Sequence, residues 1–292
     1  MKKSEDAIDV SNYCVCFIDL LGQRVALKGQ GLLPVFKNEN EQNKFLEVVK
    51  NSVGDIYWLQ IKAMEFLEPS NSNPSFLSEM TTGQKLLYDE MKKARLHQQR
   101  WSDGLVLYHS LADEYFKCPM NAVMEIFHLA GALCFLGVAS NKPIRGAIEV
   151  GWGVELHSNE LYGAVIANSY ELESTVAQYP RIVIGEATIK YLQSHIDEPI
   201  DIDNKFAVYN KTLAEMCINL TAVDQDGYRV LNYLGKQFKE NVFQEESASL
   251  FKAAYANICS QYEEHKRTCN SKLAMRYTWL RDYFNQHKKM HI

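Results

Sequence analysis

Residues 13–21, YCVCFIDLL, form an unbroken apolar and aromatic run that contains one charged residue, Asp19, and is followed by Gly22. Such a continuous run is typical of a strand that is covered on both faces of a sheet. A carboxylate in a central strand is rare unless something compensates it, because an unpaired buried charge is costly. We therefore expect this segment to be a central strand and Asp19 to have a charged partner at its end.

Residues 100–109, RWSDGLVLYH, predict a β-hairpin with Ser102, Asp103 and Gly104 at its turn. If this hairpin lies beside the first strand, Asp19 and Asp103 repel each other unless a cation lies between them. Mg²⁺ and Mn²⁺ are hard ions that prefer oxygen ligands and leave room for phosphates. Two such ions, about 3.5–4 Å apart, can activate a hydroxyl and stabilise a leaving pyrophosphate. The two carboxylates therefore predict a two-metal site for nucleotidyl transfer.

Both carboxylates also have ordinary structural explanations. Asp19 can be the N-cap of a helix that follows the strand, since Asp is favoured at that position. Asp103 can be a simple turn residue, because Asp and Gly are common in hairpin turns. The metal site is the hypothesis that explains the two residues together.

The rest of the sequence alternates helix and strand patterns. Helices are predicted over residues 40–66, 82–96, 121–139, 163–178 and 243–287, and strands over 144–152, 181–185, 206–209 and 228–234. This order predicts an α+β fold in which helices cover one face of a sheet. Residues 1–235 are expected to form one domain and residues 236–292 a helical C-terminal extension, because the tail is more readily an appendage than a second domain.

Composition narrows the function classes. The 292-residue chain has 36 acidic and 31 basic residues, a net charge of −5, and no basic block, which argues against a partner that is nucleic acid. Its seven cysteines are odd in number and lack zinc-site spacing, so buried thiols are expected. The N-terminal MKKSEDAIDV has no apolar segment, and the most apolar run, 126–139, is shorter than a membrane span. We expect a cytoplasmic protein without a membrane partner.

Four segments together resemble the class III nucleotidyl cyclases. They are residues 17–22 (FIDLLG), 100–104 (RWSDG), 145–151 (RGAIEVG) and 160–174 (ELYGAVIANSYELES). Within that family, the chain is most similar to the pyrimidine cyclases of bacterial anti-phage (Pycsar) systems. The resemblance implies a class III cyclase-like, ferredoxin-like βαββαβ sheet and a homodimeric phosphorus–oxygen lyase. The implied reaction makes cyclic UMP or cyclic CMP from UTP, which we favour, or CTP, and a separate effector reads the product.

The resemblance also implies roles for individual residues. Asp19 and Asp103 would bind two Mn²⁺ or Mg²⁺ ions, with the Leu20 carbonyl as a backbone ligand. Gln99 and Glu160 fall at or near the positions of the family's base-reading pair. The altered identities of this pair are consistent with a pyrimidine substrate.

Further contacts to the substrate are expected from the turn after the first strand and from nearby cations. The residues expected to bind the triphosphate are Leu21, Gly22 and Gln23, through backbone N–H groups, and Arg100 and Arg145. Tyr57, on the first long helix, is a candidate contact to the base edge. Each of the two arginines can instead form surface ion pairs, and Tyr57 can instead belong to the core.

Ala167 and Glu171 depart from the family pattern, which has an Asn and an Arg for the transition state at these positions. Asn168 replaces the former only if the alignment shifts by one residue. A non-catalytic, metal-dependent nucleotide sensor is therefore an alternative to the cyclase. A palm-type polymerase or dinucleotide cyclase uses the same metal chemistry, but the sequence shows no template groove and no G-G-D-E-F-like turn.

Overall fold

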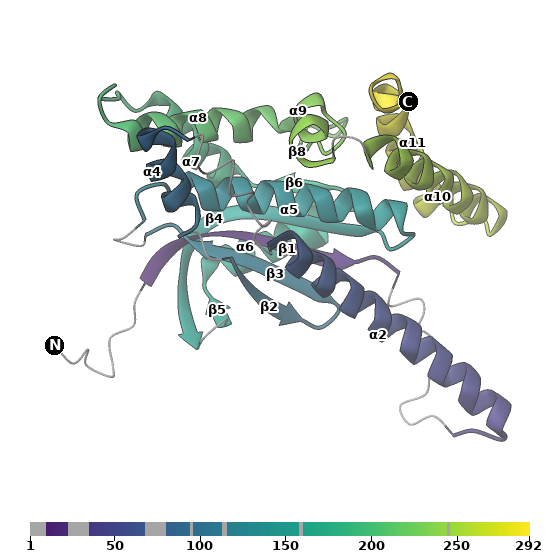
Figure 1. Ribbon diagram of the computed structural model, residues 1–292. Coiled ribbons are helices and arrows are strands. Elements are labelled where there is room, and N and C mark those ends of the chain that lie inside the picture. The colour runs from purple at the N-terminus through teal and green to yellow at the C-terminus, as the bar shows by residue number, and fades with distance from the viewer. Residues whose placement is uncertain are drawn as a thin grey trace.

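The computed structural model describes residues 10–22, 35–67, 80–93, 96–112, 116–157, 160–243 and 246–292. In this part of the chain, one sheet has the strand order β2-β3-β1-β4-β6-β8-β7, and β5 pairs with β4 (Figure 1). The strands are β1 (Val10–Leu20), β2 (His97–Trp101), β3 (Gly104–Ser110), β4 (Ile144–His157), β5 (Glu160–Tyr162), β6 (Ile182–Ile184), β7 (Thr221–Val223) and β8 (Arg229–Leu231).

The helices fall between these strands in the order expected for an α+β fold. They are α2 (Glu39–Leu67), α4 (Thr82–Met91), α5 (Met120–Ala139), α6 (Ala164–Glu171), η1 (Leu172–Val176), α7 (Glu186–Asp197), α8 (Lys205–Asn219), α9 (Lys236–Phe238), η2 (Lys239–Phe243), α10 (Ser247–Arg267) and α11 (Ser271–His291). η1 and η2 are short π-helical segments.

The first half of the sheet has the predicted βαββαβ arrangement. β1 pairs antiparallel with both β3 and β4, and β2 pairs antiparallel with β3. The order β2-β3-β1-β4, with helices between β1 and β2 and between β3 and β4, is that of a split βαβ unit. The expected α+β fold class is therefore confirmed, and β1 is the central strand that its apolar sequence predicts.

Side chains of β1 alternate between two cores. Cys14, Cys16 and Ile18 belong to the large core, which also contains most of α5. Val15 and Phe17 belong to a second, smaller core that includes Val165 and Ile166 of α6. The two faces explain why the strand is apolar throughout, because every second residue meets a different layer. Helices therefore cover the face of the large core, and α6 and η1 cover part of the opposite face, where the smaller core lies.

α5 is the core helix of the molecule. It runs along the sheet in Figure 1, and most of its residues are buried. Among the described residues it is the one helix long and apolar enough to cross a membrane, and 78% of its apolar window is buried. Since the central helix of a protein core passes the same test, this is weak evidence for a membrane span.

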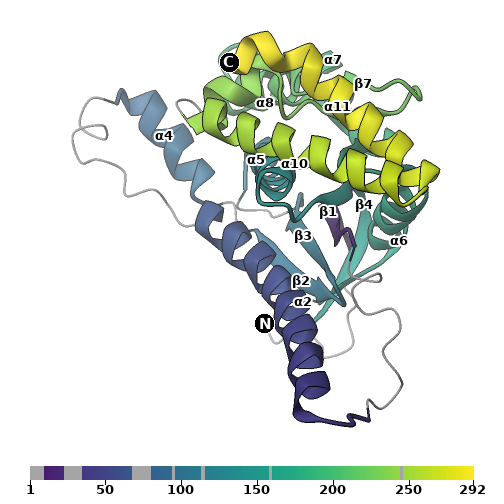
Figure 2. The same ribbon diagram turned by 90° about the vertical axis from the view of Figure 1, so that its right-hand side faces the viewer.

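The C-terminal helices α10 and α11 lie side by side and cover the end of α5 in Figure 2. Phe251 of α10 and Phe284 of α11 are fully buried and belong to the same large core as the sheet. The predicted helical C-terminal part is therefore present. The division of the chain at residue 235 stays a prediction.

Some predicted elements differ in the structure. Residues 206–209, predicted as a strand, lie inside α8, where the Asn204 side chain accepts hydrogen bonds from the backbone of Phe206 and Ala207. This N-cap outweighs the β-propensity of the short aromatic stretch that follows it. The predicted helix over 163–178 is divided into α6 and η1. Cys14 and Cys16 are buried free thiols, as predicted.

Candidate active site

The two carboxylates that the sequence singles out come from adjacent strands. Asp19 stands one residue before the end of β1, and its Cα pairs with Gly104 of β3. Asp103 directly precedes Gly104 in the turn between β2 and β3. The sheet therefore places the backbone of Asp103 next to that of Asp19 at one end of the central strand pair, on neighbouring strands as the sequence predicts. Both side chains are partly exposed.

The turn that carries Asp103 depends on a close backbone approach. A Cβ at Gly104 would lie 2.7 Å from the carbonyl oxygen of Ile18, closer than real Cβ atoms come, and a tight 3.2 Å from that of Trp101. Ser102, in the same turn, has a φ of 58°, in the left-handed region. Gly104 therefore lets β3 approach β1 at the point where the two carboxylates meet.

Arg145 of β4 lies on the other side of Asp19. Its Cα pairs with Asp19, and its Nη2 is 3.2 Å from Asp19 Oδ2. Its Nε is 2.6 Å from Oε1 of Glu173, a side chain of η1 with 2% exposure. Arg145 also donates to the carbonyl of Ala177 at 3.5 Å. Arg145 is therefore a positive charge held between Glu173 and Asp19 by ion pairs, the alternative that the sequence left open for it. Its contact with a triphosphate stays a prediction.

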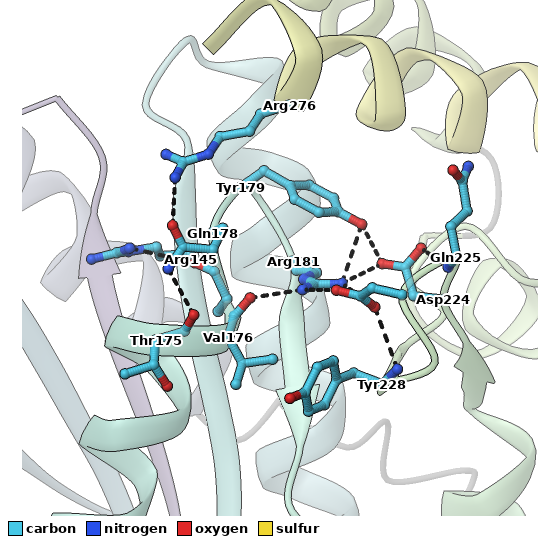
Figure 3. Close-up of polar contacts among 12 residues, drawn as sticks. Arg145, Thr175, Val176, Gln178, Tyr179, Arg181, Asp224, Gln225, Tyr228 and Arg276 are labelled. Atoms are coloured by element: carbon cyan, nitrogen blue, oxygen red, sulfur yellow. Dashed lines mark hydrogen bonds and ion pairs between the residues drawn. The ribbon is translucent and has the colours of Figure 1, made fainter. Parts of the chain in front are cut away.

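A second arginine reaches this region from the C-terminal helices. Arg276 of α11 donates a hydrogen bond to the Gln178 side chain, which follows η1 (Figure 3). Burial lowers the pKa of Arg276, and the positive charge of Arg145 lowers it further. The sequence analysis assigned no role to Arg276, since nothing in a helical tail indicates where it packs.

The turn after β1 agrees only in part with the expected phosphate loop. The N–H of Leu21 donates to the carbonyl of Pro143 at 2.9 Å, so it is directed at the protein backbone in this structure. Gly22 has a φ of 97°, which a glycine adopts without strain, and a Cβ there would meet nothing within 4 Å. Leu20 is buried and pairs with Ile144. Gln23 lies outside the described residues.

The two residues expected to read the base lie near each other. Oε1 of Gln99, on β2, accepts a hydrogen bond from the N–H of Leu161 at 3.0 Å. Leu161 directly follows Glu160 on β5, and the Glu160 side chain is exposed. Gln99 pairs with Val106, which belongs to the smaller core together with Phe17. Because side chains alternate along a strand, Gln99 faces the same side of the sheet as Asp19.

Arg100 and Tyr57 lie on the opposite side. Arg100 pairs with Leu105, which belongs to the large core, so its side chain points toward α2. There its Nη2 donates to Oε1 of Gln60 at 2.5 Å, and its guanidinium lies 5.7 Å from the ring centre of Tyr57. The structure therefore joins Arg100 and Tyr57 to each other but does not bring them to the face that carries Asp19.

Exposed aromatic rings flank Asp19 on its own face. Phe17, two residues before Asp19, makes edge contacts with Trp101 at 6.0 Å and with Tyr170 of α6 at 5.4 Å. Trp101 and Tyr170 are 45% and 47% exposed. α6 also exposes Ala167 and Glu171. This face is therefore open beside the carboxylates and presents apolar rings.

The donor set at Asp19 and Asp103 fits ions that arrive with a phosphate substrate. Among the described residues, no group of three or more His, Cys, Asp or Glu side chains could hold a metal ion. Mg²⁺ commonly takes one or two carboxylates and completes its coordination with water and substrate phosphates. Two carboxylates with the Leu20 carbonyl nearby match that pattern of ligands.

Glu173 and Arg181, like Arg276, are functional candidates that the sequence does not indicate. Glu173 stands in a helical pattern, where an acidic residue ordinarily faces solvent. Arg181 of the 181–185 segment is 4% exposed and binds Asp224 and Asp226, which lie more than 40 residues away in the chain. A buried arginine is recognised only once its partners are placed, and no local pattern in the sequence gives that placement.

No family profile matches the chain, and no curated protein does. Among solved structures, the chain is similar to a dimeric guanylyl cyclase domain from the aquatic fungus Blastocladiella emersonii, with 12% identity and a TM-score of 0.37, over 67% of this chain and 93% of that one. It is also similar to the catalytic core of a rhodopsin-guanylyl cyclase with converted specificity in complex with ATPαS, with 12% identity and a TM-score of 0.37, over 77% and 98%. Similarity at this level supports no conclusion about activity.

Proposed function

We propose that the chain is a nucleotide cyclase that converts a pyrimidine ribonucleoside triphosphate, UTP in preference to CTP, into its 3′,5′-cyclic monophosphate and pyrophosphate. The observation that carries the proposal is the pairing of Asp19 with Gly104, which sets Asp103 beside Asp19 at the end of two central strands. The βαββαβ strand order and the resemblance of residues 17–22 and 100–104 to cyclase motifs support it.

Asp19 and Asp103 would hold two Mn²⁺ or Mg²⁺ ions, with the Leu20 carbonyl as a further ligand. Bound there, the ions lower the pKa of the ribose 3′-hydroxyl and balance the charge of the leaving pyrophosphate. Arg145 supplies a fixed positive charge next to Asp19, and Glu173 keeps it oriented. The turn at Gly22 provides backbone without side-chain obstruction for the phosphates. Catalysis is then mostly positioning and charge neutralisation.

The substrate and setting follow from the resemblance together with the residues of this face. Gln99 accepts a hydrogen bond from the residue that follows Glu160, and we propose that both side chains contact the base through hydrogen bonds. The exposed Trp101 and Tyr170 suit a second copy of the chain, so we propose a homodimer. We place the enzyme in the cytoplasm of a bacterium, as the source of a second messenger for anti-phage defence that acts on a separate effector, with neither nucleic acid nor membrane as a partner.

The test is incubation of the purified chain with ATP, GTP, CTP and UTP in the presence of Mn²⁺, followed by chromatography. We expect a cyclic pyrimidine monophosphate and an equal amount of pyrophosphate from the wild type, and neither from Asp103→Asn. A wild type that releases no cyclic product from any of the four nucleotides would contradict the proposal. A product of more than one nucleotide would instead support polymerase-type chemistry.

A second candidate is a nucleotide sensor without turnover. The exposure of Ala167 and Glu171 on α6 favours it, because neither side chain can replace the Asn and Arg that the resemblance expects there. Calorimetry distinguishes the two candidates. A sensor binds triphosphate in the presence of metal, with injection heats that diminish as the site saturates and without pyrophosphate, whereas a cyclase consumes the ligand.

A further inference from the structure

A cavity of about 250 Å³ lies between the β6, β7 and β8 end of the sheet and helix α11. It is separate from the Asp19 face, and none of the residues discussed as substrate contacts lines it. The residues that line it include Tyr179, Arg181, Asn232, Tyr233, Tyr283 and His287, with the exposed Gln225 and Gln286 at the rim. Pockets for drug-sized ligands span roughly 300–1,000 Å³, so this cavity suits a somewhat smaller molecule.

The walls of the cavity are aromatic and already fixed in place. The rings of Tyr233 and Tyr283 meet edge to face at 5.2 Å, and Tyr233 is 1% exposed. The Tyr283 hydroxyl donates to Oδ1 of Asn232 at 2.9 Å and accepts from the N–H of Leu234 at 2.9 Å. A ligand would therefore enter a preformed space, without the cost of ordering its walls.

The charged side chains in the wall pair with one another and leave no spare cation. Arg181 binds Asp224 at 2.7 Å and Asp226 at 2.6 Å, and the Tyr179 hydroxyl donates to Asp224 (Figure 3). Burial opposes the charge of Arg181, but Asp226, Tyr179 and Asp224 outweigh burial and raise its pKa. One arginine and two aspartates give this cluster a net negative charge, so it repels an anion. An uncharged ligand therefore fits the cavity better than a phosphate, which would need a cation to pair with.

Neutral hydrogen-bonding groups converge on the opening. The structure gives the side-chain amides of Gln225 and Gln286 no hydrogen bond within the described residues, and each amide carries a donor and an acceptor. Nδ1 of His287 is 2.9 Å from the carbonyl oxygen of Tyr283. A carbonyl only accepts, so Nδ1 carries the proton and Nε2 of the neutral ring is an acceptor. The rim therefore recognises a ligand that has both N–H donors and ring or carbonyl acceptors.

We infer that this cavity is a binding site for a small, uncharged, planar nitrogen heterocycle, of the size of a nucleobase or nucleoside. Planarity matches the tyrosine rings, on which a flat π-system packs well. The mixture of donors and acceptors matches the amides of Gln225 and Gln286. The Arg181 cluster, which has a net negative charge and no spare cation, accounts for the preference against a phosphate.

The Arg181 wall of the cavity is linked to the candidate active site through the segment η1. Nη2 of Arg181 donates to the carbonyl of Val176 at 2.7 Å, and Val176 ends the segment η1 that carries Glu173. Glu173 in turn holds Arg145 beside Asp19. A ligand in the cavity is thus placed to change the rate of the active site. This regulatory effect rests on the proposed function, whereas the binding does not.

The test of binding is calorimetric titration of the full chain with uridine, cytidine, adenosine and guanosine, which carry no phosphate. We expect at least one to bind with a one-to-one stoichiometry, and Gln286→Ala to weaken it about tenfold through loss of a hydrogen bond. A second glutamine variant is the matched control: Gln193→Ala, at an exposed position of α7, should leave the affinity unchanged. Gln99→Ala, on the Asp19 face, reports whether the nucleoside binds at the candidate active site instead.

Three outcomes would overturn the inference. The first is that none of the four nucleosides binds a chain whose circular dichroism is native. The second is that binding is lost in Gln99→Ala but kept in Gln286→Ala, which would place the nucleoside at the candidate active site. The third is that binding is unchanged in both Gln286→Ala and His287→Ala. If binding depends on Gln286 but the chain makes no cyclic product from any nucleotide, the inference about the cavity stands and the proposed cyclase activity is wrong.

Discussion

Asp19 and Asp224 have nearly the same exposure, 21% and 19%, and each is ion-paired with an arginine, but their surroundings differ. Asp224 accepts from Arg181 at 2.7 Å, from the Tyr179 hydroxyl and from the N–H of Gln225 at 2.8 Å. The contact of Asp19 with Arg145 is longer, at 3.2 Å, and lies on an open face of the sheet beside a second carboxylate, Asp103.

The difference indicates what each cluster is for. Short ion pairs from the buried Arg181 to two carboxylates hold β6, β7 and β8 together, because removing one member leaves an uncompensated charge. A carboxylate that faces another carboxylate on an open surface does little for stability and is better explained by a ligand that it binds. The same Asp→Asn change in the two clusters should therefore separate function from stability.

The largest effect is expected from Asp19→Asn. It removes a negative charge where metal ions would bind, and we expect cyclic product to fall by about 10³-fold, the size of loss typical of a displaced transition-state charge. The free energy of unfolding should change by less than about 1 kcal/mol, since Arg145 keeps its ion pair with Glu173. Product formation and urea unfolding, measured on the same preparation, check both statements. A folded Asp19→Asn variant with full activity would remove Asp19 from the site.

The second effect is expected from Asp224→Asn. It leaves Arg181, which is 4% exposed, with a single carboxylate and should lower the free energy of unfolding by about 2–4 kcal/mol. Urea denaturation measures it. Activity at a temperature where the variant is folded should stay within a few-fold of wild type. Equal destabilisation by Asp19→Asn and Asp224→Asn would mean that the two clusters do not differ in the way described here.

The sequence predicts the central part of this comparison well. The apolar run of β1 and the hairpin at Asp103 are local patterns, and they predict that the two aspartates lie on neighbouring strands, with which the pairing of Asp19 and Gly104 agrees. The βαββαβ strand order is what the resemblance implies. Gln99 and Glu160 were paired through resemblance, and the hydrogen bond from Leu161 to Gln99 agrees with their proximity. Local patterns are enough here because the strands are adjacent in the sheet, and a short turn and a regular strand register determine the face on which each side chain lies.

The rest depends on packing between distant segments. Arg100 points to the face of the sheet on which its cross-strand neighbour Leu105 packs, which is the large core. The sequence alone does not determine which face each residue of this hairpin occupies. Residues 206–209 resemble a strand until Asn204 is recognised as an N-cap. Arg276 finds its partner Gln178 98 residues away in the chain, and Arg181 finds Asp224 43 residues away. No periodicity encodes such contacts.

A smaller effect should follow from Glu173→Gln, which sharpens the role of the arginine beside Asp19. The amide keeps the shape of the side chain but removes the charge that holds Nε of Arg145 at 2.6 Å. We expect the KM for the nucleotide to rise about tenfold with a smaller change in kcat, because Arg145 would be less well oriented toward the triphosphate. Glu173→Asp should recover part of the loss. An unchanged KM would show that the orientation of Arg145 does not depend on the charge of Glu173.

The smallest effect concerns Glu125, a carboxyl of α5 that, unlike Asp19 and Asp224, has no ion pair among the described residues. Burial raises its pKa to about 7 from the ordinary 4.5. The folded state therefore holds this proton between pH 4.5 and 7 while the unfolded state loses it, so its contribution to stability declines as the pH rises through that interval. Glu125→Gln should match the wild type near pH 4.5 and be more stable by on the order of 1 kcal/mol at pH 7.5. His128, whose pKa burial lowers to about 4, titrates with the opposite sign but is present in both proteins, so the difference between their urea unfolding curves isolates Glu125. A difference that does not grow with pH would show that Glu125 finds a partner, as the two aspartates do, and the contrast between paired and unpaired carboxylates would not hold.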